Sequence, residues 1–494
     1  MTPVSILSRW TAVYVALASL LWGQVVQAGE WRARPSFTAG QRYSDNINAA
    51  PAGQERDEFI TTIASGIAVE GRGARARVNA NYNAQRYFFM KDTRPDDVTH
   101  FLTSNLMTEI VEDFFYFDAR AAMAPTVIAN TGRITNQNYI LADQNRADVL
   151  NYSFTPRLRR RLGSWATASL SKTFTDTTAQ RPNDPSQTNL QGSGSGSNLQ
   201  ARLQSGREFG RLGWSLDYSE RSFTTDVGGQ DSTLRRTRAN GNYRLNRKWR
   251  LNGSVGQETN DFVGNNQTGS RANWSIGATW TPSPRTRIEG SWGKRAFGNT
   301  KNFNFSHRLR RLNLRGRYTE DYATTADILQ TQRVYSNVDE FGRPLTTPFD
   351  PSNLVDPNLL NTNLGLTNDV FVSRRLEADI GYRYRLNSFR FGIFRAEQES
   401  ARVQSTEEAL GTNFNWSRPL GRQTTWSLNI SRQDRTGNSG QESVQSLFVT
   451  PRITHRLGAH VNTSLGYSYS ENSSDRGTFD YEENAVFVTL GYAF

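Results

Sequence analysis

Side chains that could act as nucleophiles, bases or metal ligands are scarce in this sequence. Histidine occurs only at positions 100, 307, 455 and 460, and the chain contains no cysteine. The lack of cysteine excludes a disulfide framework, a cysteine zinc site and a lipoprotein anchor. Serine is abundant, so a Ser/His/Asn set of the kind that outer-membrane lipases use stays an alternative, although no local motif singles out its members.

One cluster of acidic and amide residues, Asp45-Asn46-Ile47-Asn48, offers the oxygen atoms that calcium prefers. The cluster lacks the residue spacing of an EF-hand loop, and such stretches are more often solvated turns. The sequence therefore predicts no catalytic residue, no cofactor and no metal site.

The composition is typical of a chain that buries aromatic side chains without a continuous apolar core. Mean hydropathy is −0.65, yet aromatic residues make up 11% of the chain and glycine occurs 39 times. A disordered chain has few aromatics. A helical membrane protein needs about 20 consecutive apolar residues per span, and no segment after the first 30 residues provides them. A barrel whose alternate residues face lipid and water fits this composition.

Residues 1–28 have the features of a secretory signal peptide. Arg9 is the only charge, Thr11 to Trp22 are mostly apolar, and Val26-Gln27-Ala28 forms a small-x-small cleavage site. The apolar stretch is shorter than a membrane span needs, which argues against an N-terminal anchor. We expect cleavage near Ala28, export to the outer membrane of a Gram-negative cell, and one β-barrel domain over residues 29–494.

Apolar and polar residues alternate along the whole chain after residue 28. In residues 74–85 the even positions are apolar or aromatic, and the odd positions are Arg, Asn and Gln. The same period of two runs through Ala272, Trp274, Ile276, Ala278 and Trp280. Period-two alternation predicts strands with one apolar and one polar face, and in a transmembrane barrel these faces meet lipid and lumen.

The lengths of the predicted connections alternate between short and long. Short turns are expected near 71–73, 111–113, 159–163, 206–210, 246–248, 281–285, 308–311, 385–388, 418–423 and 455–459. Longer segments lie between them, and only the connection near 297–301 is brief where a long one is expected. Outer-membrane barrels sort their periplasmic turns and extracellular loops in this way. We predict an antiparallel up-and-down barrel of about 22 strands (range 18–24) with both termini in the periplasm.

Two of the long connections have features of their own. The predicted extracellular loop from about 320 to 367 is the longest and contains four prolines. It could fold into the lumen as a constriction, or it could lie exposed at the surface, and the sequence does not decide between them. The glycine-serine run 192–197 predicts a flexible loop.

Basic residues exceed acidic ones, with 58 Lys and Arg against 46 Asp and Glu. Because they are dispersed through the strands and not gathered in one patch, nucleic acid is not an expected partner. The alternation places one set of arginines toward the lumen, where they would attract an acidic solute or polysaccharide. The alternative is that these arginines pair with Asp217, Glu289 and Asp379 in a structural network. The predicted lumenal set is Arg75, Arg77, Arg250, Arg287, Arg315, Arg317, Arg383 and Arg390.

The C-terminal segment alternates up to the last residue. Val486, Val488, Leu490, Tyr492 and Phe494 share one face of a predicted strand. This arrangement resembles the C-terminal signal read by the outer-membrane assembly machinery, with Phe494, Tyr492 and Leu490 as its main residues. We expect this strand to pair with the strand that starts near Trp31 and to close the barrel.

The N-terminal third also resembles a known family. Four segments carry this likeness, namely Tyr43-Ser44-Asp45-Asn46, Asp57-Glu58-Phe59-Ile60-Thr61, Gly71-Arg72-Gly73-Ala74-Arg75 leading to Tyr82, and Phe117-Asp118-Ala119-Arg120-Ala121. They resemble the PEP-CTERM system-associated outer-membrane proteins, which occur in Gram-negative bacteria beside exosortase and exopolysaccharide loci. The likeness covers about residues 37–175, and the exopolysaccharide-transport barrels of the same loci are similar as well.

The resemblance implies a role in the export or surface assembly of an extracellular polysaccharide, or of sorted proteins, with periplasmic export components as partners. It supplies no catalytic residue. Three hypotheses remain at this point: a polysaccharide-secretion pore, a structural or docking barrel with a plugged lumen, and a barrel-embedded lipid or sugar hydrolase.

Overall fold

A computed structural model describes most of the chain after residue 28. The described residues are 29–134, 145–181, 190–229, 231–261, 271–331, 364–402, 405–437, 443–477 and 479–494. The predicted signal peptide and the central part of the predicted longest loop, residues 332–363, lie outside them. Within the described residues no helix is long and apolar enough to cross a membrane.

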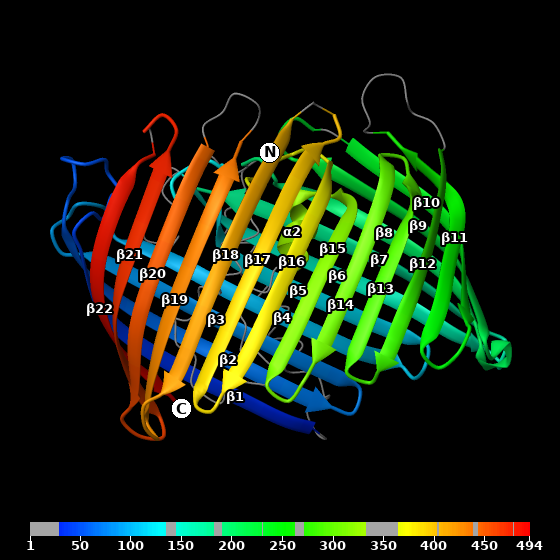
Figure 1. The fold of residues 1–494 in the computed structure, drawn as a ribbon, viewed down its shortest axis with the longest axis horizontal. Coiled ribbons are helices and arrows are strands. Elements are labelled where there is room, and N and C mark those ends of the chain that lie inside the picture. Colours follow the sequence, from blue (N-terminus) through cyan, green and yellow to red (C-terminus); the bar gives the residue numbers. More distant parts are fainter. Residues whose placement is uncertain are drawn as a thin grey trace.

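The described residues form one antiparallel sheet of 22 strands (Figure 1), which confirms the predicted fold class and strand number. The only other regular elements among them are a short 3-10 helix, Arg207–Phe209, and the helix α2, Thr325–Thr331. The strands are β1 (Gly29–Ser44), β2 (Glu58–Gly73), β3 (Ala76–Phe89), β4 (Asp97–Val111), β5 (Phe115–Val127), β6 (Arg146–Leu162), β7 (Ala166–Gln180), β8 (Gly194–Ser205), β9 (Leu212–Thr225), β10 (Asp231–Arg244), β11 (Trp249–Asn260), β12 (Arg271–Ser283), β13 (Thr286–Arg295), β14 (Gly298–Arg308), β15 (Leu312–Ala323), β16 (Phe371–Tyr384), β17 (Asn387–Ser400), β18 (Thr406–Pro419), β19 (Thr424–Thr436), β20 (Ser443–Arg456), β21 (Val461–Ser474) and β22 (Tyr481–Ala493).

The sheet closes on itself through its first and last strands. β1 pairs with β2 on one side and with β22 on the other, in a register that runs from Ser36↔Ala493 to Ser44↔Ala485. The backbone N–H of Phe494 continues this ladder by donating to the carbonyl oxygen of Pro35 at 3.1 Å. The closure confirms the pairing that was expected for the C-terminal strand, and it leaves no edge strand in the membrane.

The connections are sorted by length between the two ends of the barrel. Ten of them contain two to six residues, from 385–386 to 206–211, and all ten lie at one end, which we call the turn end. At the other end, the loop end, six of the eleven connections contain seven or more residues, four contain five or six, and the link 296–297 contains two. The loop end thus carries all the connections longer than six residues, as the sequence predicted, and the brief connection near 297–301 is present as well.

The register assigns every strand residue to the lipid face or to the lumen, because directly opposed residues in an antiparallel pair share one face. On the lipid face, apolar side chains such as Leu216, Val255 and Ile276 remain 52%, 63% and 61% exposed. On the lumenal face of β3, the polar side chains of Asn83 and Gln85 are buried. The predicted alternation of residues 76–85 is therefore present in the structure.

A row of tyrosines marks the lipid-facing surface toward the loop end. The hydroxyls of Tyr218, Tyr318 and Tyr469 each donate to a glutamate two residues further along the same strand. Tyrosine is enriched at membrane–water interfaces because its ring is apolar and its hydroxyl needs a polar partner. These three residues therefore place the membrane boundary below their glutamates on β9, β15 and β21.

Buried apolar residues gather at the loop end, where connections pack onto the lumenal wall. One cluster joins Ile47 and Ala49 of the β1–β2 loop to Ile60, Tyr87, Phe101 and Tyr481. Others join Leu366 to Ala147 and Val149, and Ile134 to Phe448. The wall itself needs no such core because its apolar face is turned toward lipid.

The glycine-serine run 192–197 is mostly strand and not the flexible loop that the composition predicted. Gly194 and Gly196 belong to β8 and pair with β7 and β9. A Cβ atom on Gly194 would lie 2.9 Å from the Phe223 ring, and one on Gly196 would lie 3.1 Å from it. Phe223 therefore packs over the two glycines, and their small size serves this contact.

An arginine placed on the lipid face of β19 should destabilise the barrel, whereas one on its lumenal face should not. Leu428 faces lipid and Asn429 faces the lumen. A cation near the bilayer midplane costs about 2–4 kcal/mol. We therefore expect Leu428→Arg to lower the free energy of unfolding by roughly 2 kcal/mol and Asn429→Arg to change it by less than about 0.5 kcal/mol. Urea unfolding in phospholipid vesicles, read by heat-modifiable migration on a gel, measures both, and equal losses would contradict the assigned faces.

Candidate functional site

The lumen is lined by two chemically different walls. From β18 to β21 the residues that face it at mid-height are mostly amides and hydroxyls, among them Asn413, Asn415, Asn429, Ser431, Thr450 and Ser464. We call this the amide–hydroxyl wall. From β10 to β17 the lumenal positions carry many arginines, and this is the arginine wall: Arg236, Arg238, Arg250, Arg287, Arg315, Arg317, Arg375, Arg383 and Arg390.

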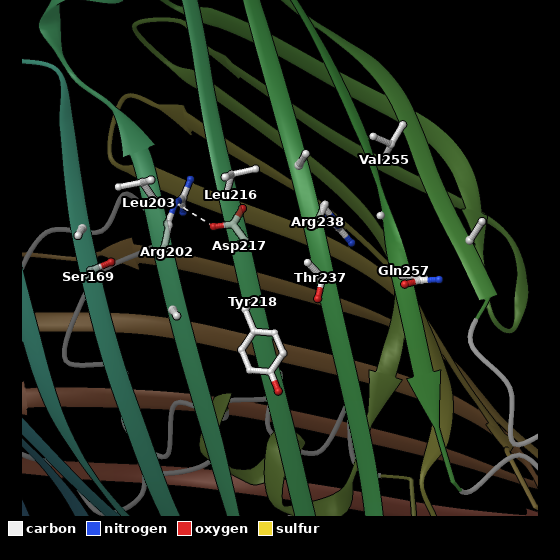
Figure 2. Close-up of a pocket in the computed structure, with 15 residues that line it drawn as sticks. Ser169, Arg202, Leu203, Leu216, Asp217, Tyr218, Thr237, Arg238, Val255 and Gln257 are labelled. Carbon is white, nitrogen blue, oxygen red and sulfur yellow. Dashed lines mark ion pairs between the residues drawn. The ribbon is translucent and has the colours of Figure 1, made fainter.

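Some arginines in the lumen pair with carboxylates. Arg202 lies 3.2 Å from Asp217 on the neighbouring strand (Figure 2), and Arg390 lies 3.2 Å from Asp379. Arg287 pairs with Glu289. Asp217, Glu289 and Asp379 are the acidic residues that the sequence suggested as partners. Part of the basic charge is therefore neutralised inside the protein.

Other arginines of this wall have no such partner. In the part of the chain that the structure describes, no carboxylate lies within 4.0 Å of the guanidinium groups of Arg236, Arg238, Arg315 or Arg317. Arg238 and Asp217 face each other across β10 and β9, but the nearer cation to Asp217 is Arg202. These four arginines leave a net positive charge along β10 and β15.

Seven of the eight arginines predicted to face the lumen do so by register, namely Arg77, Arg250, Arg287, Arg315, Arg317, Arg383 and Arg390. The eighth, Arg75, lies in the two-residue turn between β2 and β3, because β3 begins only at Ala76. Its guanidinium pairs with Glu112 of the neighbouring turn at 2.7 Å. Arg75 is therefore a residue of the turn end and not of the strand face.

Arg202, Arg236 and Arg238 also face the lumen, although they are not among the arginines predicted to do so. Arg235 and Arg236 are adjacent, so the alternation does not say which of them faces water. The register resolves the choice: Arg236 and Arg238 face the lumen, and Arg235 faces outward and pairs with Glu220 at 3.0 Å. The face of Arg235 and Arg236 depends on their partners in the neighbouring strand, and the sequence of a single strand does not identify those partners.

The four histidines lie in three separate parts of the barrel, because His455 and His460 share the β20–β21 hairpin while His100 is in β4 and His307 in β14. His307 and His455 each contact a threonine directly across the ladder, Thr286 and Thr424, at 2.8 Å. His100 contacts the hydroxyl of Tyr82, and His460 contacts the carbonyl oxygen of Ala493. This arrangement offers nothing that favours the hydrolase hypothesis.

At the loop end, inward-folded connections cross the lumen. We call residues 128–134, 190–193, 324–331, 364–370 and 401–402 the loop plug. Its first segment reaches the opposite wall: the amide of Asn130 donates to the carbonyl oxygens of Glu408 at 3.4 Å and Thr436 at 3.1 Å. Arg435, which is only 2% exposed, donates to the carbonyl oxygens of Asn130 and Gly132. β5 and β19 are thus joined through the interior.

The two described ends of the longest connection belong to the same plug. Leu366 donates its backbone N–H to the carbonyl oxygen of Ile128 at 2.9 Å, and Asn368 accepts from the backbone of Gly192 at 2.7 Å. The helix α2 contacts β6 and β7 as well as its own strand β15, and it lies inside the barrel (Figure 1). Asp327 of this helix pairs with Arg221 of β9 at 3.1 Å. The described ends therefore favour a constriction over an exposed loop.

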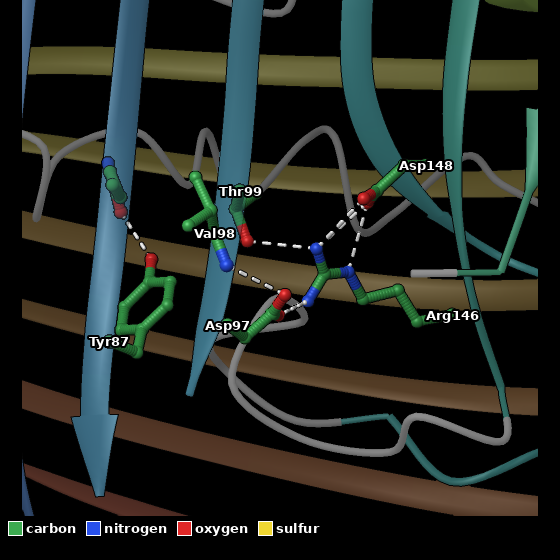
Figure 3. A network of polar contacts seen from close by, with 7 residues as sticks. Tyr87, Asp97, Val98, Thr99, Arg146 and Asp148 are labelled. Atoms are coloured by element: carbon green, nitrogen blue, oxygen red, sulfur yellow. Dashed lines mark hydrogen bonds and ion pairs between the residues drawn. The ribbon is translucent and has the colours of Figure 1, made fainter. Parts of the chain in front are cut away.

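A buried ion-pair network fixes the strand that follows the first plug segment. Arg146, at the start of β6, contacts Asp97 at 2.6 Å, Asp148 at 2.9 Å and the hydroxyl of Thr99 at 2.8 Å (Figure 3). Its side chain is 3% exposed. Removing one member of such a group leaves an uncompensated buried charge, which is strongly destabilising. The network therefore ties the start of β6 to β4.

The outer rim of the loop end carries an exposed ion pair. Lys91 donates to the carboxylate of Asp57 between two neighbouring loops. This hydrogen bond lowers the pKa of Asp57 and raises the pKa of Lys91. Both groups are solvent-exposed, so the pair contributes little to stability.

The sequence matches no protein-family model, and it has no match among curated proteins. Among solved structures, it is similar to the siderophore receptor PirA from Acinetobacter baumannii, at 9% identity over 94% of this chain and 80% of the receptor, with a TM-score of 0.49. PirA from Pseudomonas aeruginosa (12% identity, 94% and 80% covered, TM-score 0.40) and OccK2 from the same organism (8%, 94% and 98%, TM-score 0.36) are also similar. These likenesses concern the fold of an outer-membrane β-barrel.

Loss of Arg435 should loosen the loop plug without affecting the wall. Arg435→Met removes the donors to Asn130 and Gly132 but keeps most of the side-chain volume. Arg432→Met is the matched control, because Arg432 lies on the outward face of the same strand. We expect larger and longer open events in planar-bilayer recordings of Arg435→Met, and wild-type behaviour in the control. Identical traces for all three proteins would show that this anchor does not hold the plug.

Proposed function

We propose that the chain is an outer-membrane passage used in the export or surface assembly of an extracellular polysaccharide. The observation that carries this proposal is the lumen itself. An amide–hydroxyl wall adjoins an arginine wall where β17 pairs with β18, and the loop plug crosses the lumen at one end only. This combination provides a hydrated path through the barrel that the loop plug closes at the loop end.

The chemistry of the two walls suits a sugar polymer. Asn, Gln, Ser and Thr both donate and accept hydrogen bonds, so they can replace water around sugar hydroxyls at little net cost. Passage needs binding that is favourable yet weak and repeated at many sites. The amide–hydroxyl wall provides such repeated positions, and the arginine wall adds attraction for negatively charged groups.

In the proposed orientation the turn end faces the periplasm and both termini lie there. The resemblance to PEP-CTERM system-associated proteins supports a role beside exosortase and exopolysaccharide loci, and it implies periplasmic export components as partners. The outward row Val486, Val488, Leu490 and Tyr492 next to Phe494 would then be read by the outer-membrane assembly machinery.

A docking barrel with a permanently closed lumen is the second candidate. The observation that favours it is the number of bonds that tie the loop plug from wall to wall, including the contacts of Asn130 and Leu366. The two candidates differ in whether the plug can open. In a gated passage the plug closes only the loop end and can open, and the lumen between the plug and the turn end stays filled with water.

Conductance separates the candidates. Purified wild-type protein and Arg435→Met are inserted into planar bilayers, and a strain lacking the gene is assayed for surface polysaccharide. A passage predicts conductance that rises in the variant, together with loss of surface polymer in the strain. Silence in both proteins with surface polymer still lost would favour the docking barrel, and normal polymer in the strain would reject the proposed role.

The lumenal arginines should make an open barrel anion-selective. Arg236→Gln combined with Arg238→Gln removes two positive charges without an ion-pair partner in the described residues from β10. We expect the anion-to-cation permeability ratio to fall severalfold, because a low-dielectric wall focuses the field of its charges. Arg235→Gln on the same strand faces outward and should leave the ratio unchanged. Reversal potentials across a salt gradient measure it, and an equal fall in the control would refute the lumenal assignment.

A further inference from the structure

The turn end of the lumen carries a ring of arginines. Each occupies a lumenal strand position next to a short turn, and together they come from seven of the ten turn-end hairpins. Their faces follow from register pairs such as Arg72↔Arg77, Arg244↔Arg250 and Arg308↔Asn313. We call them the mouth arginines: Arg72, Arg77, Arg161, Arg244, Arg250, Arg287, Arg308, Arg383 and Arg456.

A repeated dipeptide produces part of this ring. At four hairpins the lumen-facing arginine is followed directly by an exposed leucine: Arg161-Leu162, Arg244-Leu245, Arg308-Leu309 and Arg456-Leu457. Three of these leucines are the first residue of the turn, and Leu162 is the last residue of β6. The same two residue types thus recur at the same structural position around the barrel, which indicates a shared task of the turns and not four unrelated surface charges.

Few carboxylates balance this charge. Arg287 pairs with Glu289, and Arg161 lies 3.5 Å from Asp113. Six mouth arginines have no ion-pair partner within 4.0 Å in the described residues, namely Arg72, Arg77, Arg244, Arg250, Arg308 and Arg456. The mouth is therefore more positive than the loop end, where the buried Arg42, Arg146 and Arg295 pair with carboxylates.

Two hairpins place arginine directly opposite arginine. Arg72 faces Arg77, and Arg244 faces Arg250, in adjacent strands of the lumenal wall. Like charges in directly opposed positions destabilise a sheet. Departures from the rules of stability are expected at functional sites. The repeated departure at the mouth therefore indicates a ligand that supplies the missing negative charge.

We propose that the mouth arginines capture a polyanionic saccharide, of the kind that carries a carboxylate on its repeating unit, at the turn end of the lumen. This inference rests on the proposed function and adds the charge of the polymer and the end at which it is bound. A guanidinium group binds a carboxylate through two parallel hydrogen bonds. Many weak contacts along one chain also raise its effective concentration at the mouth.

The positions of these residues favour a polymer over lipid or protein. They face the lumen, so they cannot reach phospholipid headgroups outside the barrel. On β10 the positive charge continues inward from Arg244 to Arg238 and Arg236. Beside Arg308 of β14, the neighbouring strand β15 carries Arg315 and Arg317 further inward. A folded protein that docks from outside would contact the projecting turns, whereas a threaded chain would follow this continuous row.

Two variants with the same loss of charge test the proposal. The mouth variant carries R72Q, R77Q, R244Q, R250Q, R308Q and R456Q. The turn variant carries R75Q, R247Q, R285Q, R310Q, R311Q and R422Q, which lie in the turns themselves. Each full-length protein is placed in nanodiscs of phosphatidylcholine, and binding of a fluorescent oligogalacturonate is measured by anisotropy, with a neutral maltodextrin as the reference ligand.

We expect wild-type protein to bind the oligogalacturonate and not the maltodextrin, with affinity that falls as salt is raised. The mouth variant should lose about tenfold in affinity, because several charge-assisted contacts disappear together, while the turn variant should change by less than about twofold. Equal losses in the two variants would overturn the lumenal site, and would point to diffuse attraction or to a protein-docking surface. No binding by the wild-type protein would overturn the polyanion itself.

Sidedness gives a second readout. The chain has no cysteine, so Gly421→Cys in the β18–β19 turn allows an impermeant thiol reagent to report which side of a planar bilayer holds the turn end. Oligogalacturonate should block current more often from that side, and block from the loop side alone would contradict the proposal. Because anisotropy needs no current, a silent barrel that still binds the polymer would reject the passage and keep the capture site.

Discussion

The pairing of β1 with β22 is the constraint on which the rest of the structure depends. Inside a bilayer every backbone N–H and C=O group needs a partner within the protein, and only a closed sheet provides one for all strands. The ladder from Ser36↔Ala493 to Ser44↔Ala485 closes this sheet. Closure with an even number of strands brings both ends of the sheet to the turn end. It also forces period-two sequences, because every strand then has one face toward lipid and one toward the lumen.

Closure also separates the stability of the wall from the stability of the plug. The wall is held by its ladders and by lipid around residues such as Val255 and Ile276. The plug is held by a limited set of long-range contacts, including those of Arg435 and Leu366. A segment held by few contacts can open locally at a lower free energy than the whole fold. The architecture therefore permits a plug that moves inside a barrel that does not.

The wall could be predicted from the sequence because its determinants are local. Alternation in residues 76–85 and 272–280, and the lengths of the connections, each depend only on neighbouring residues. Arg75 was misplaced because β3 begins at Ala76, which leaves Arg75 in the turn although its parity is that of the lumenal Arg77. The composition of 192–197 predicted a flexible loop, whereas Gly194 and Gly196 lie in a strand and make room for Phe223 of the neighbouring strand. The inward folding of 364–370 depends on contacts with 128–134, more than 200 residues away, and no local pattern encodes them.

The compensation of charge changes along the lumen in one direction. At the turn end Arg72, Arg77, Arg244 and Arg250 have no ion-pair partner in the described residues. At mid-height some arginines are paired, as Arg202 is with Asp217.

At the loop end three buried arginines pair with carboxylates. Arg42 pairs with Glu483, Arg146 with Asp97 and Asp148, and Arg295 with Glu258 and Asp321. A negatively charged chain would therefore be attracted most strongly where it is first bound and least strongly at the plug. Because a static field does no net work on a chain that passes through it, this gradient determines the end at which the polymer is captured and not the direction in which it moves.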